Sequence, residues 1–259
     1  MGSTQTKPIK TCKICRFYNG NIMSQTWFRD TDVHHDDGPA YIEYYENGNP
    51  KSQIWYKDGK RHRDGDRPAE IDYYENGKHK SQIWYKDGRC HREQSSWNLF
   101  ESSGNSDKPA QIYYYENGKI LIKKWVKYNR CHRDGDEPAE IVYYGDGNLK
   151  SQIWYKDGRC HRGLHPSRDG ENGPAHIKIN KNKKFDLTTG KEIHSDGDTH
   201  IIEYWYKDGK PFNMKGGPII IHYNNHIKVR EVWNNNCFYN DTIDFYPNEK
   251  LKMEIFVVE

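Results

Sequence analysis

Apolar and polar positions recur along the chain in units of 29 residues. The segment Ser-Gln-Ile-Trp-Tyr-Lys-Asp-Gly at 52–59 returns unchanged at 81–88 and at 151–158. A proline opens each successive unit: Pro39, Pro68, Pro109, Pro138 and Pro174. Two intervals exceed 29 residues because of insertions near 93–107 and 163–172. Self-similarity at this period is typical of repeat architectures.

Each unit predicts one antiparallel hairpin. In the second unit, 69–74 reads as a first strand and 81–85 as a second. The Asn76-Gly77 step between them is a strong hairpin signal, because both residue types tolerate positive φ. Lys86-Asp87-Gly88 is a further turn signal, which predicts the end of the second strand. Helical periodicity is absent, so the chain is predicted to be all-β.

Comparison of the units with one another indicates which residues pack. An Ile recurs in the first strand, a Tyr follows two positions later on the same face, and a Trp recurs in the second strand. The predicted repeat core consists of Ile42, Ile71, Ile112 and Ile141, of Tyr44, Tyr73, Tyr114 and Tyr143, and of Trp27, Trp55, Trp84, Trp125 and Trp154. The intervening row varies freely and is expected to face solvent: Glu43, Asp72, Tyr113 and Val142.

The later units deviate from the consensus. The unit opened by Pro174 is expected to lose its Trp and to use Phe185, while 201–209 reads as a separate, shortened unit. A further unit spans 218–233, and the apolar segment 255–258 predicts a closing strand. The expected organisation is an N-terminal capping strand (1–16), tandem hairpins (17–235) and a C-terminal capping segment (236–259), because the ends of a repeat array need caps.

Composition narrows the fold class. Only 34% of the residues are hydrophobic, and mean hydropathy is −1.15. Disorder would explain these values, but 20 Tyr, 8 Trp and a net charge of only +3 argue against it. An elongated single array, built as a twisted extended sheet with little interior, fits this composition.

Neither a membrane-spanning helix nor a signal peptide is indicated. No run of 18 apolar residues occurs, and residues 1–10 lack an apolar core. The expected location is therefore cytoplasmic or otherwise intracellular, which for a viral protein means the host cytoplasm or the virion.

A family resemblance rests on the turn Tyr73-Tyr74-Glu75-Asn76-Gly77, on the Trp strand and on the closing Asp-Gly. These features resemble the MORN repeat family over about residues 11–235. The longer variant class, seen in bacterial antitoxin-like proteins and large DNA viruses, is the nearer match. This chain departs from ordinary MORN units by inserting a His-Arg-Asp-Gly segment after the second strand. The resemblance implies scaffolding, dimerisation or lipid-headgroup binding.

A His-Arg ladder is the most regular polar feature. It consists of His62 and Arg63, His91 and Arg92, His132 and Arg133, and His161 and Arg162, with His34-His35 near the equivalent place in the first unit. Equivalent residues lie about 10 Å apart, because each repeat adds two strands of about 4.8 Å. A zinc ion needs ligands within about 2.3 Å, so neighbouring rungs cannot share one. We expect each Arg stem to cover an aromatic ring and each His to bond a turn carbonyl; the alternative is a polyanion-binding row.

The cysteines give a similar result. Cys90, Cys131 and Cys160 fill one repeat position and are expected to be free thiols, because rungs about 10 Å apart exceed the disulfide limit of about 7 Å. Cys12 and Cys15 form a CxxC and are a weak zinc candidate. Alignment with the first full unit places them in one strand on opposite faces, which disfavours a shared ion. We expect no cofactor.

No catalytic arrangement is apparent. Ser52, Ser81 and Ser151 recur too regularly to form one active site, so an enzyme is not expected. The expected function is a scaffold for protein–protein interaction, with specificity from the varying row and the two insertions. The alternatives are an antitoxin-like inhibitor of one effector protein and a polyanion binder, for phosphoinositide or nucleic acid, through the His-Arg ladder. Open sheet edges are compatible with homo-oligomers.

Overall fold

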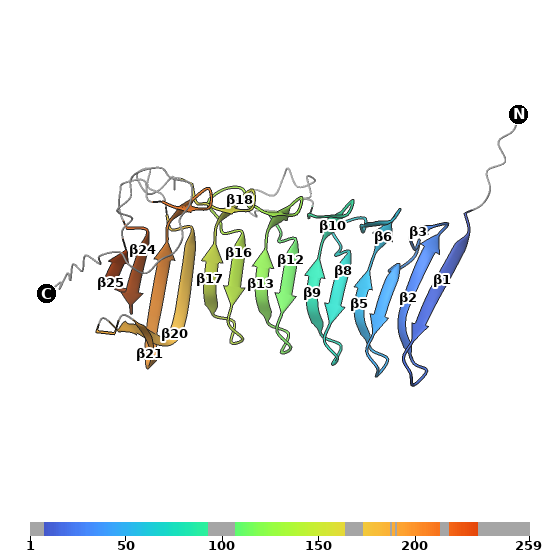
Figure 1. Ribbon diagram of the computed structural model, residues 1–259, viewed down its shortest axis with the longest axis horizontal. Coiled ribbons are helices and arrows are strands. Elements are labelled where there is room, and N and C mark those ends of the chain that lie inside the picture. The colour runs from blue at the N-terminus through green and yellow to red at the C-terminus, as the bar shows by residue number, and fades with distance from the viewer. Residues whose placement is uncertain are drawn as a thin grey trace, which may run out of the picture. The chain divides into compact units, whose positions relative to one another are not determined.

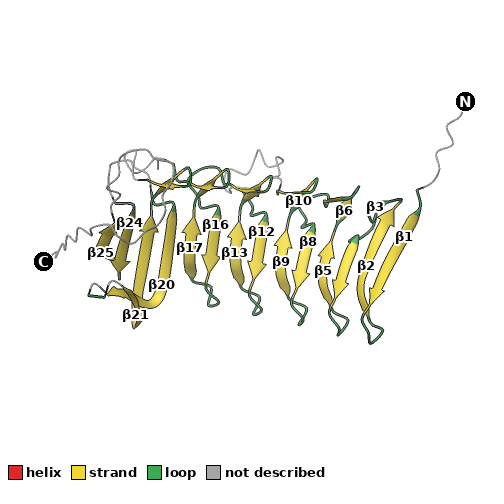
Figure 2. Ribbon diagram, in the orientation of Figure 1, coloured by secondary structure: helices red, strands yellow, loops and turns green. Residues whose placement is uncertain are grey.

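The computed structural model describes residues 8–92, 107–163, 173–186, 188–189, 191–212 and 218–232. Every regular element in these ranges is a β-strand, as Figure 2 shows. The prediction of an all-β array of tandem antiparallel hairpins is confirmed. The chain forms two compact units, residues 1–131 with 143–148 and residues 132–142 with 149–259, and each is described by itself.

In the first unit, the long strands lie side by side in chain order in one open antiparallel sheet (Figure 1). Their order is β1-β2-β4-β5-β8-β9-β12-β13. They are β1 (Lys10–Arg16), β2 (Ile22–Arg29), β4 (Tyr41–Tyr44), β5 (Pro50–Ile54), β8 (Glu70–Tyr73), β9 (His79–Ile83), β12 (Gln111–Tyr114) and β13 (Ile120–Lys124). The two-residue strand β3 (Asp32–Val33) pairs with the end of β2.

The second unit repeats this arrangement with the order β16-β17-β20-β21-β24-β25. Its long strands are β16 (Glu140–Tyr143), β17 (Leu149–Ile153), β20 (His176–Asp186), β21 (Lys191–Tyr204), β24 (Ile220–Asn224) and β25 (Ile227–Val232). Neighbouring strands from β17 to β25 pair antiparallel, which allows short turns to connect the two strands of a hairpin.

A second set of hairpins was not predicted. The second strand of a repeat breaks at its Trp, and the chain then makes a short two-stranded hairpin. These pairs are β6 (Tyr56–Lys57) with β7 (Lys60–Arg61), β10 (Tyr85–Lys86) with β11 (Arg89–Cys90), β14 (Val126–Lys127) with β15 (Arg130–Cys131), β18 (Tyr155–Lys156) with β19 (Arg159–Cys160), and β22 (Tyr206–Lys207) with β23 (Lys210–Pro211). The Asp-Gly step that was interpreted as the end of a strand is the turn of this hairpin.

The two kinds of hairpin use different turns. At the Asp-Gly step both residues take positive φ, 49° at Asp87 and 81° at Gly88, as a two-residue type I′ turn requires. At the Asn-Gly step only Gly77 does so, with φ 81°, while the side-chain oxygen of Asn76 accepts a hydrogen bond from the amide of Lys78 at 3.0 Å. The Asn-Gly step forms the predicted hairpin turn, but only its glycine adopts the positive φ that both residue types tolerate. The longer turn adds an irregularity in the register between Asp72 and Tyr73.

The most buried residues of the repeats are alanines that the sequence did not single out: Ala40, Ala69, Ala110, Ala139 and Ala175, each at most 1% exposed. Each of Ala40, Ala69, Ala110 and Ala175 accepts a hydrogen bond at its carbonyl from the amide of the preceding repeat's Trp, as Ala110 does from Trp84 at 2.9 Å. The almost complete burial of this position next to that bond favours a small side chain.

The predicted core residues differ in burial. Trp84, Trp125 and Trp154 are buried, whereas Trp27 and Trp55 are half-buried. Ile71 is buried, and the other predicted Ile and Tyr residues are half-buried. In an open sheet a side chain is buried only where another part of the chain packs against its face. Burial therefore differs from repeat to repeat along the Ile, Tyr and Trp rows.

The expectation that the intervening row faces solvent is wrong. Glu43, Asp72, Tyr113 and Val142 are all half-buried. The Ser81 hydroxyl donates to the carboxylate of Asp72 at 2.7 Å. The short hairpins fold over this face: Arg61 donates to Glu70, two positions from Asp72 on the same strand, at 2.8 Å. Ile83, Cys90, Ala110 and Val126 form a small apolar cluster there, with Tyr85 and Cys131 packed against it.

The segments opened by Pro174 and spanning 201–209 form one repeat, not two. Strands β20 and β21 pair over an unusually long hairpin. The amide of Trp205 donates to the carbonyl of Ile219, and the amide of Phe212 donates to that of Trp205. Trp84 and His91 make the same pattern of bonds in the second repeat. Trp205 therefore holds the Trp position, so the expected loss of Trp is wrong, and the side chain of Phe185 lies outside the described part.

Several predictions fall outside the described residues: most of the insertions at 93–107 and 163–172, Trp233, and the C-terminal segment 236–259 with its closing strand. The organisation into an N-terminal cap, a repeat region and a C-terminal cap stays a prediction, although residues 10–16 do form strand β1. The described part of the chain contains no helix that could span a membrane.

Candidate binding surfaces

The arginines of the His-Arg ladder lie over the tryptophan rings. The guanidinium carbon of Arg63 is 3.7 Å from the centre of the Trp55 ring. The equivalent distances are 3.8 Å from Arg92 to Trp84 and 4.0 Å from Arg162 to Trp154. The expectation that Arg covers an aromatic ring is confirmed at these rungs, with the charged group itself over the ring as a cation–π contact.

The ladder arginines also link each repeat to the next one. Each donates, at 3.0–3.3 Å, to the carbonyl of the proline that opens the following repeat: Arg63, Arg92, Arg133 and Arg162. Arg92 further donates to both carboxylate oxygens of Asp66, and Arg162 to both of Asp136. The Arg92 bond holds the pKa of Asp66 down at about 2, with a second contribution from Lys108. The Arg92, Arg133 and Arg162 side chains are only 9–11% exposed, so they present little charge to solvent.

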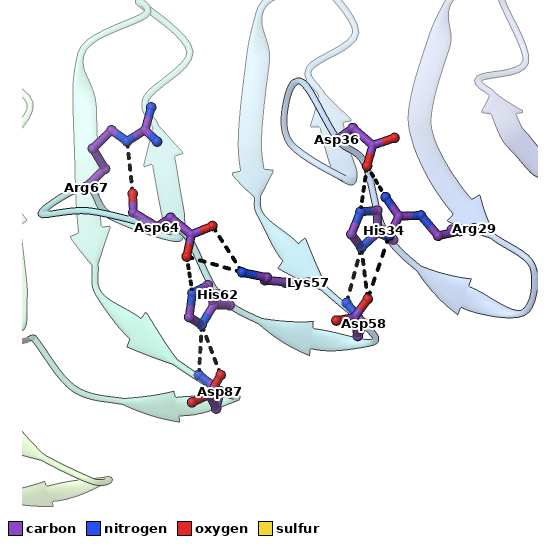
Figure 3. Close-up of polar contacts among 9 residues, drawn as sticks. All are labelled: Arg29, His34, Asp36, Lys57, Asp58, His62, Asp64, Arg67 and Asp87. Atoms are coloured by element: carbon purple, nitrogen blue, oxygen red, sulfur yellow. Dashed lines mark hydrogen bonds and ion pairs between the residues drawn. The ribbon is translucent and has the colours of Figure 1, made fainter. Parts of the chain in front are cut away.

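The histidines link adjacent repeats through backbone and carboxylate groups. Nδ1 of His62 accepts a hydrogen bond from the amide of Asp87 at 3.2 Å, and Nε2 lies 3.0 Å from the carboxylate of Asp64 (Figure 3). His34 makes the same pair of bonds to Asp58 and Asp36. His132 and His161 accept from the amides of Asp157 and Asp208. The expected bond to a turn carbonyl is therefore wrong: the ring accepts from a turn amide, which leaves Nε2 to donate.

His91 departs from this pattern. Its ring stacks on Tyr128, with centroids 4.3 Å apart and planes within 9°. Tyr128 holds the turn position that Asp holds in the neighbouring repeats. Nδ1 of His91 is buried without a hydrogen-bond partner. Burial, followed by the charges of Lys86 and Lys127, lowers the pKa of His91.

The cysteines lie in strands. Cys12 is opposite Trp27 and Cys15 is opposite Ser24 in the pairing of β1 with β2, so their side chains leave opposite faces. Cys90, Cys131 and Cys160 lie in the short hairpins and are not joined in disulfides. Burial raises the pKa of Cys90 and of Cys160 to about 11. Among the described residues, no cluster of three His, Cys, Asp or Glu side chains could hold a metal ion.

One face of the first unit carries a row of tyrosines, which we call the tyrosine face. The hydroxyls of Tyr44, Tyr73 and Tyr114 donate to the side-chain oxygens of Gln25, Gln53 and Gln82, one repeat earlier, at 2.7–2.9 Å. Ile42, Ile71 and Ile112 lie two positions before these tyrosines on the same face. Most of these side chains are half-buried, so each ring is held in place while part of it stays accessible.

A row of exposed cations lies on the short hairpins and was missed in the sequence. In the first unit, Lys57 is opposite Lys60, Lys86 is opposite Arg89, and Lys127 is opposite Arg130. We call these six residues the basic row. All are exposed except Lys86, which is half-buried. The recurrent Lys-Asp-Gly-Lys/Arg turn could have revealed this row, had the turn been recognised as the tip of a hairpin.

Three segments match the MORN repeat variant family: residues 40–60, 69–87 and 110–124. The first spans β4, β5 and β6, the second β8, β9 and β10, and the third β12 and β13. No curated protein matches the chain. MORN repeats are in general motifs for interaction with proteins or lipids, and the family is non-enzymatic. These three segments are therefore MORN repeats of the variant type, as the sequence indicated.

Proposed function

We propose that the chain is a non-enzymatic repeat scaffold that binds a protein partner through the tyrosine face. The observation that carries this proposal is the fixed, half-accessible row of Tyr44, Tyr73 and Tyr114. Tyrosine is enriched in the centres of protein interfaces, where a rigid ring contributes contact area at low cost in side-chain entropy. Hydrogen bonds to Gln25, Gln53 and Gln82 have already restricted these rings before a partner arrives.

The burial of the His-Arg ladder supports a protein partner over a polyanion at that ladder. Arg92 and Arg162 already have a ring, a carbonyl and a carboxylate as partners. Binding a phosphate there would require these contacts to break. A ladder engaged in this way stabilises the repeats and leaves recognition to other surfaces.

The test combines capture from the native host with variants of the tyrosine face. Gln53→Arg together with Gln82→Arg places long charged side chains among the tyrosines, and Lys60→Ser with Arg130→Ser is the matched control on the short hairpins. Capture is done at about 0.15 M salt, with and without nuclease. We expect a nuclease-resistant partner that the Gln variant loses and the control retains.

Two other outcomes would change the proposed binding surface or the proposed function. A partner captured equally by both variants would overturn the tyrosine face as the binding surface. A single stoichiometric partner whose own activity is blocked would identify an antitoxin-like inhibitor. Circular dichroism of both variants checks that the fold is retained.

A further inference from the structure

The basic row keeps like charges opposite each other on neighbouring strands. Lys57 and Lys60, Lys86 and Arg89, and Lys127 and Arg130 are direct cross-strand pairs. Like charges in such pairs destabilise a hairpin. Lys57 also lies 3.2 Å from the carboxylate of Asp64. Cations nevertheless recur at positions where they repel one another, which points to an anionic ligand outside the fold.

The three short hairpins of the first unit follow one another in series. The amide of Gly88 donates to the carbonyl of Arg61 at 2.9 Å, and the amide of Asn129 donates to that of Cys90 at 3.0 Å. These bonds set the cation pairs at intervals of about 10 Å, the width of two strands. The carboxylates of the first two turns, Asp58 and Asp87, lie 3.5 and 3.2 Å from the imidazoles of His34 and His62.

The third turn of the row differs in chemistry. Tyr128 takes φ 48° and Asn129 φ 69°, where the other turns have Asp and Gly. Positive φ is unusual and strained for a bulky aromatic residue. The tyrosine is 49% exposed, although one side of its ring stacks on His91. This turn thus replaces a carboxylate with an exposed ring, between the exposed cations Lys127 and Arg130.

We propose that the basic row binds single-stranded nucleic acid, with a base stacked on Tyr128 and the phosphates held by Lys60, Arg89 and Arg130. An exposed ring among cations provides both contacts that such ligands use, stacking for the base and charge for the backbone. An acidic polypeptide would need the cations but not the ring. This surface is distinct from the tyrosine face and does not depend on the protein partner proposed above.

The test measures fluorescence anisotropy of a labelled deoxythymidine oligomer of roughly 20 nucleotides against the full chain. The double variant Tyr128→Asp with Asn129→Gly restores the turn found in the other repeats and should fold normally. We expect it to weaken binding about tenfold, because stacking of one base is lost. Tyr128→Phe keeps the ring and should retain the affinity.

Charge variants complete the design. Arg89→Ser with Arg130→Ser should lower the slope of log affinity against log salt by about 1.4, because each phosphate contact on a single strand contributes about 0.7. The matched control is Lys156→Ser with Arg159→Ser, at an equivalent pair in the second unit, and should have little effect.

Three results would overturn the proposal. The first is no binding at low salt. The second is affinity that is unchanged by Tyr128→Asp with Asn129→Gly but lost on removing the arginines, which would indicate a generic polyanion surface. The third is polyglutamate binding as tightly as the oligomer, which would assign the basic row to an acidic protein.

Discussion

At the scale of single residues, the same side chain can contribute differently to stability in different repeats. Arg63 and Arg92 occupy one repeat position, and each covers a Trp and donates to a Pro carbonyl. Arg92 adds a two-pronged bond to Asp66, whereas the described residues provide Arg63 with no carboxylate bond. Planar, bidentate recognition of a carboxylate is a property of arginine that lysine lacks.

This difference predicts the result of a matched pair of substitutions. Arg92→Lys should lower the free energy of unfolding by about 2–3 kcal/mol, because it loses the ring contact and the fork to Asp66 while retaining the charge. Arg63→Lys should cost about 1 kcal/mol, since only the ring and carbonyl contacts change. Urea denaturation of both variants measures the difference. Equal losses would show that the Asp66 bond adds nothing to stability.

At the scale of the element, each short hairpin with an Asp-Gly turn depends on its glycine. A Cβ at Gly88 would meet Lys60 at an ordinary contact distance of 3.7 Å, so space does not exclude a side chain. The constraint is the backbone, because φ is 81° and the amide is bonded to Arg61. Gly145, in a long-strand turn, has no such φ and has open space around its Cβ.

We therefore expect opposite effects from the same substitution at two sites. Gly88→Ala should lower the unfolding free energy by about 1–2 kcal/mol through strain at positive φ. Gly145→Ala should raise it by up to about 1 kcal/mol, because the unfolded chain loses freedom while the fold is unaffected. Thermal denaturation of both variants provides the comparison. Destabilisation at Gly145 would mean that this turn needs a conformation that alanine does not reach.

For the whole molecule, the sequence predicted what depends on local signals. The period, the hairpins and the Ile, Tyr and Trp rows follow from turn residues and alternation. Packing between elements was harder to predict. The burial of Ala110 depends on the neighbouring Trp84 strand, and the coverage of Asp72 depends on a short hairpin that was interpreted as a strand end. The basic row was missed for the same reason, because its cations share a surface only once that hairpin is known.

The second unit contains a buried polar cluster that the repeat pattern did not predict. His200 is 1% exposed; its Nδ1 lies 2.9 Å from the carboxylate of Glu192 and its Nε2 lies 3.0 Å from Nδ1 of His222. Asn180 and Lys183 also bond Glu192. Burial, followed by the charges of His200 and Arg230, lowers the pKa of His222 to about 4.

This arrangement predicts an acid response of the second unit. Between about pH 6.5 and pH 4 the imidazole of His222 is protonated in the unfolded chain but stays neutral in the folded chain. The free energy of unfolding therefore falls as pH falls through this window. The loss should reach at most about 3 kcal/mol and stop near pH 4, where the folded state also binds the proton. Asp66, in the first unit, responds in the same direction at lower pH, because its lowered pKa contributes stability above about pH 4 that is lost toward pH 2.

Unfolding measured by hydrogen exchange in β24 at several pH values tests this response. His222→Gln should flatten the dependence between pH 6.5 and 4, because the group that binds the extra proton in the unfolded chain is gone. His194→Gln is the matched control, since His194 lies in the same unit with a side chain that is 72% exposed. If both variants kept the slope of the parent, the acid sensitivity would lie outside the His200–His222 pair. If only His222→Gln removed it, this pair would be the main acid-sensitive site of the second unit in that window.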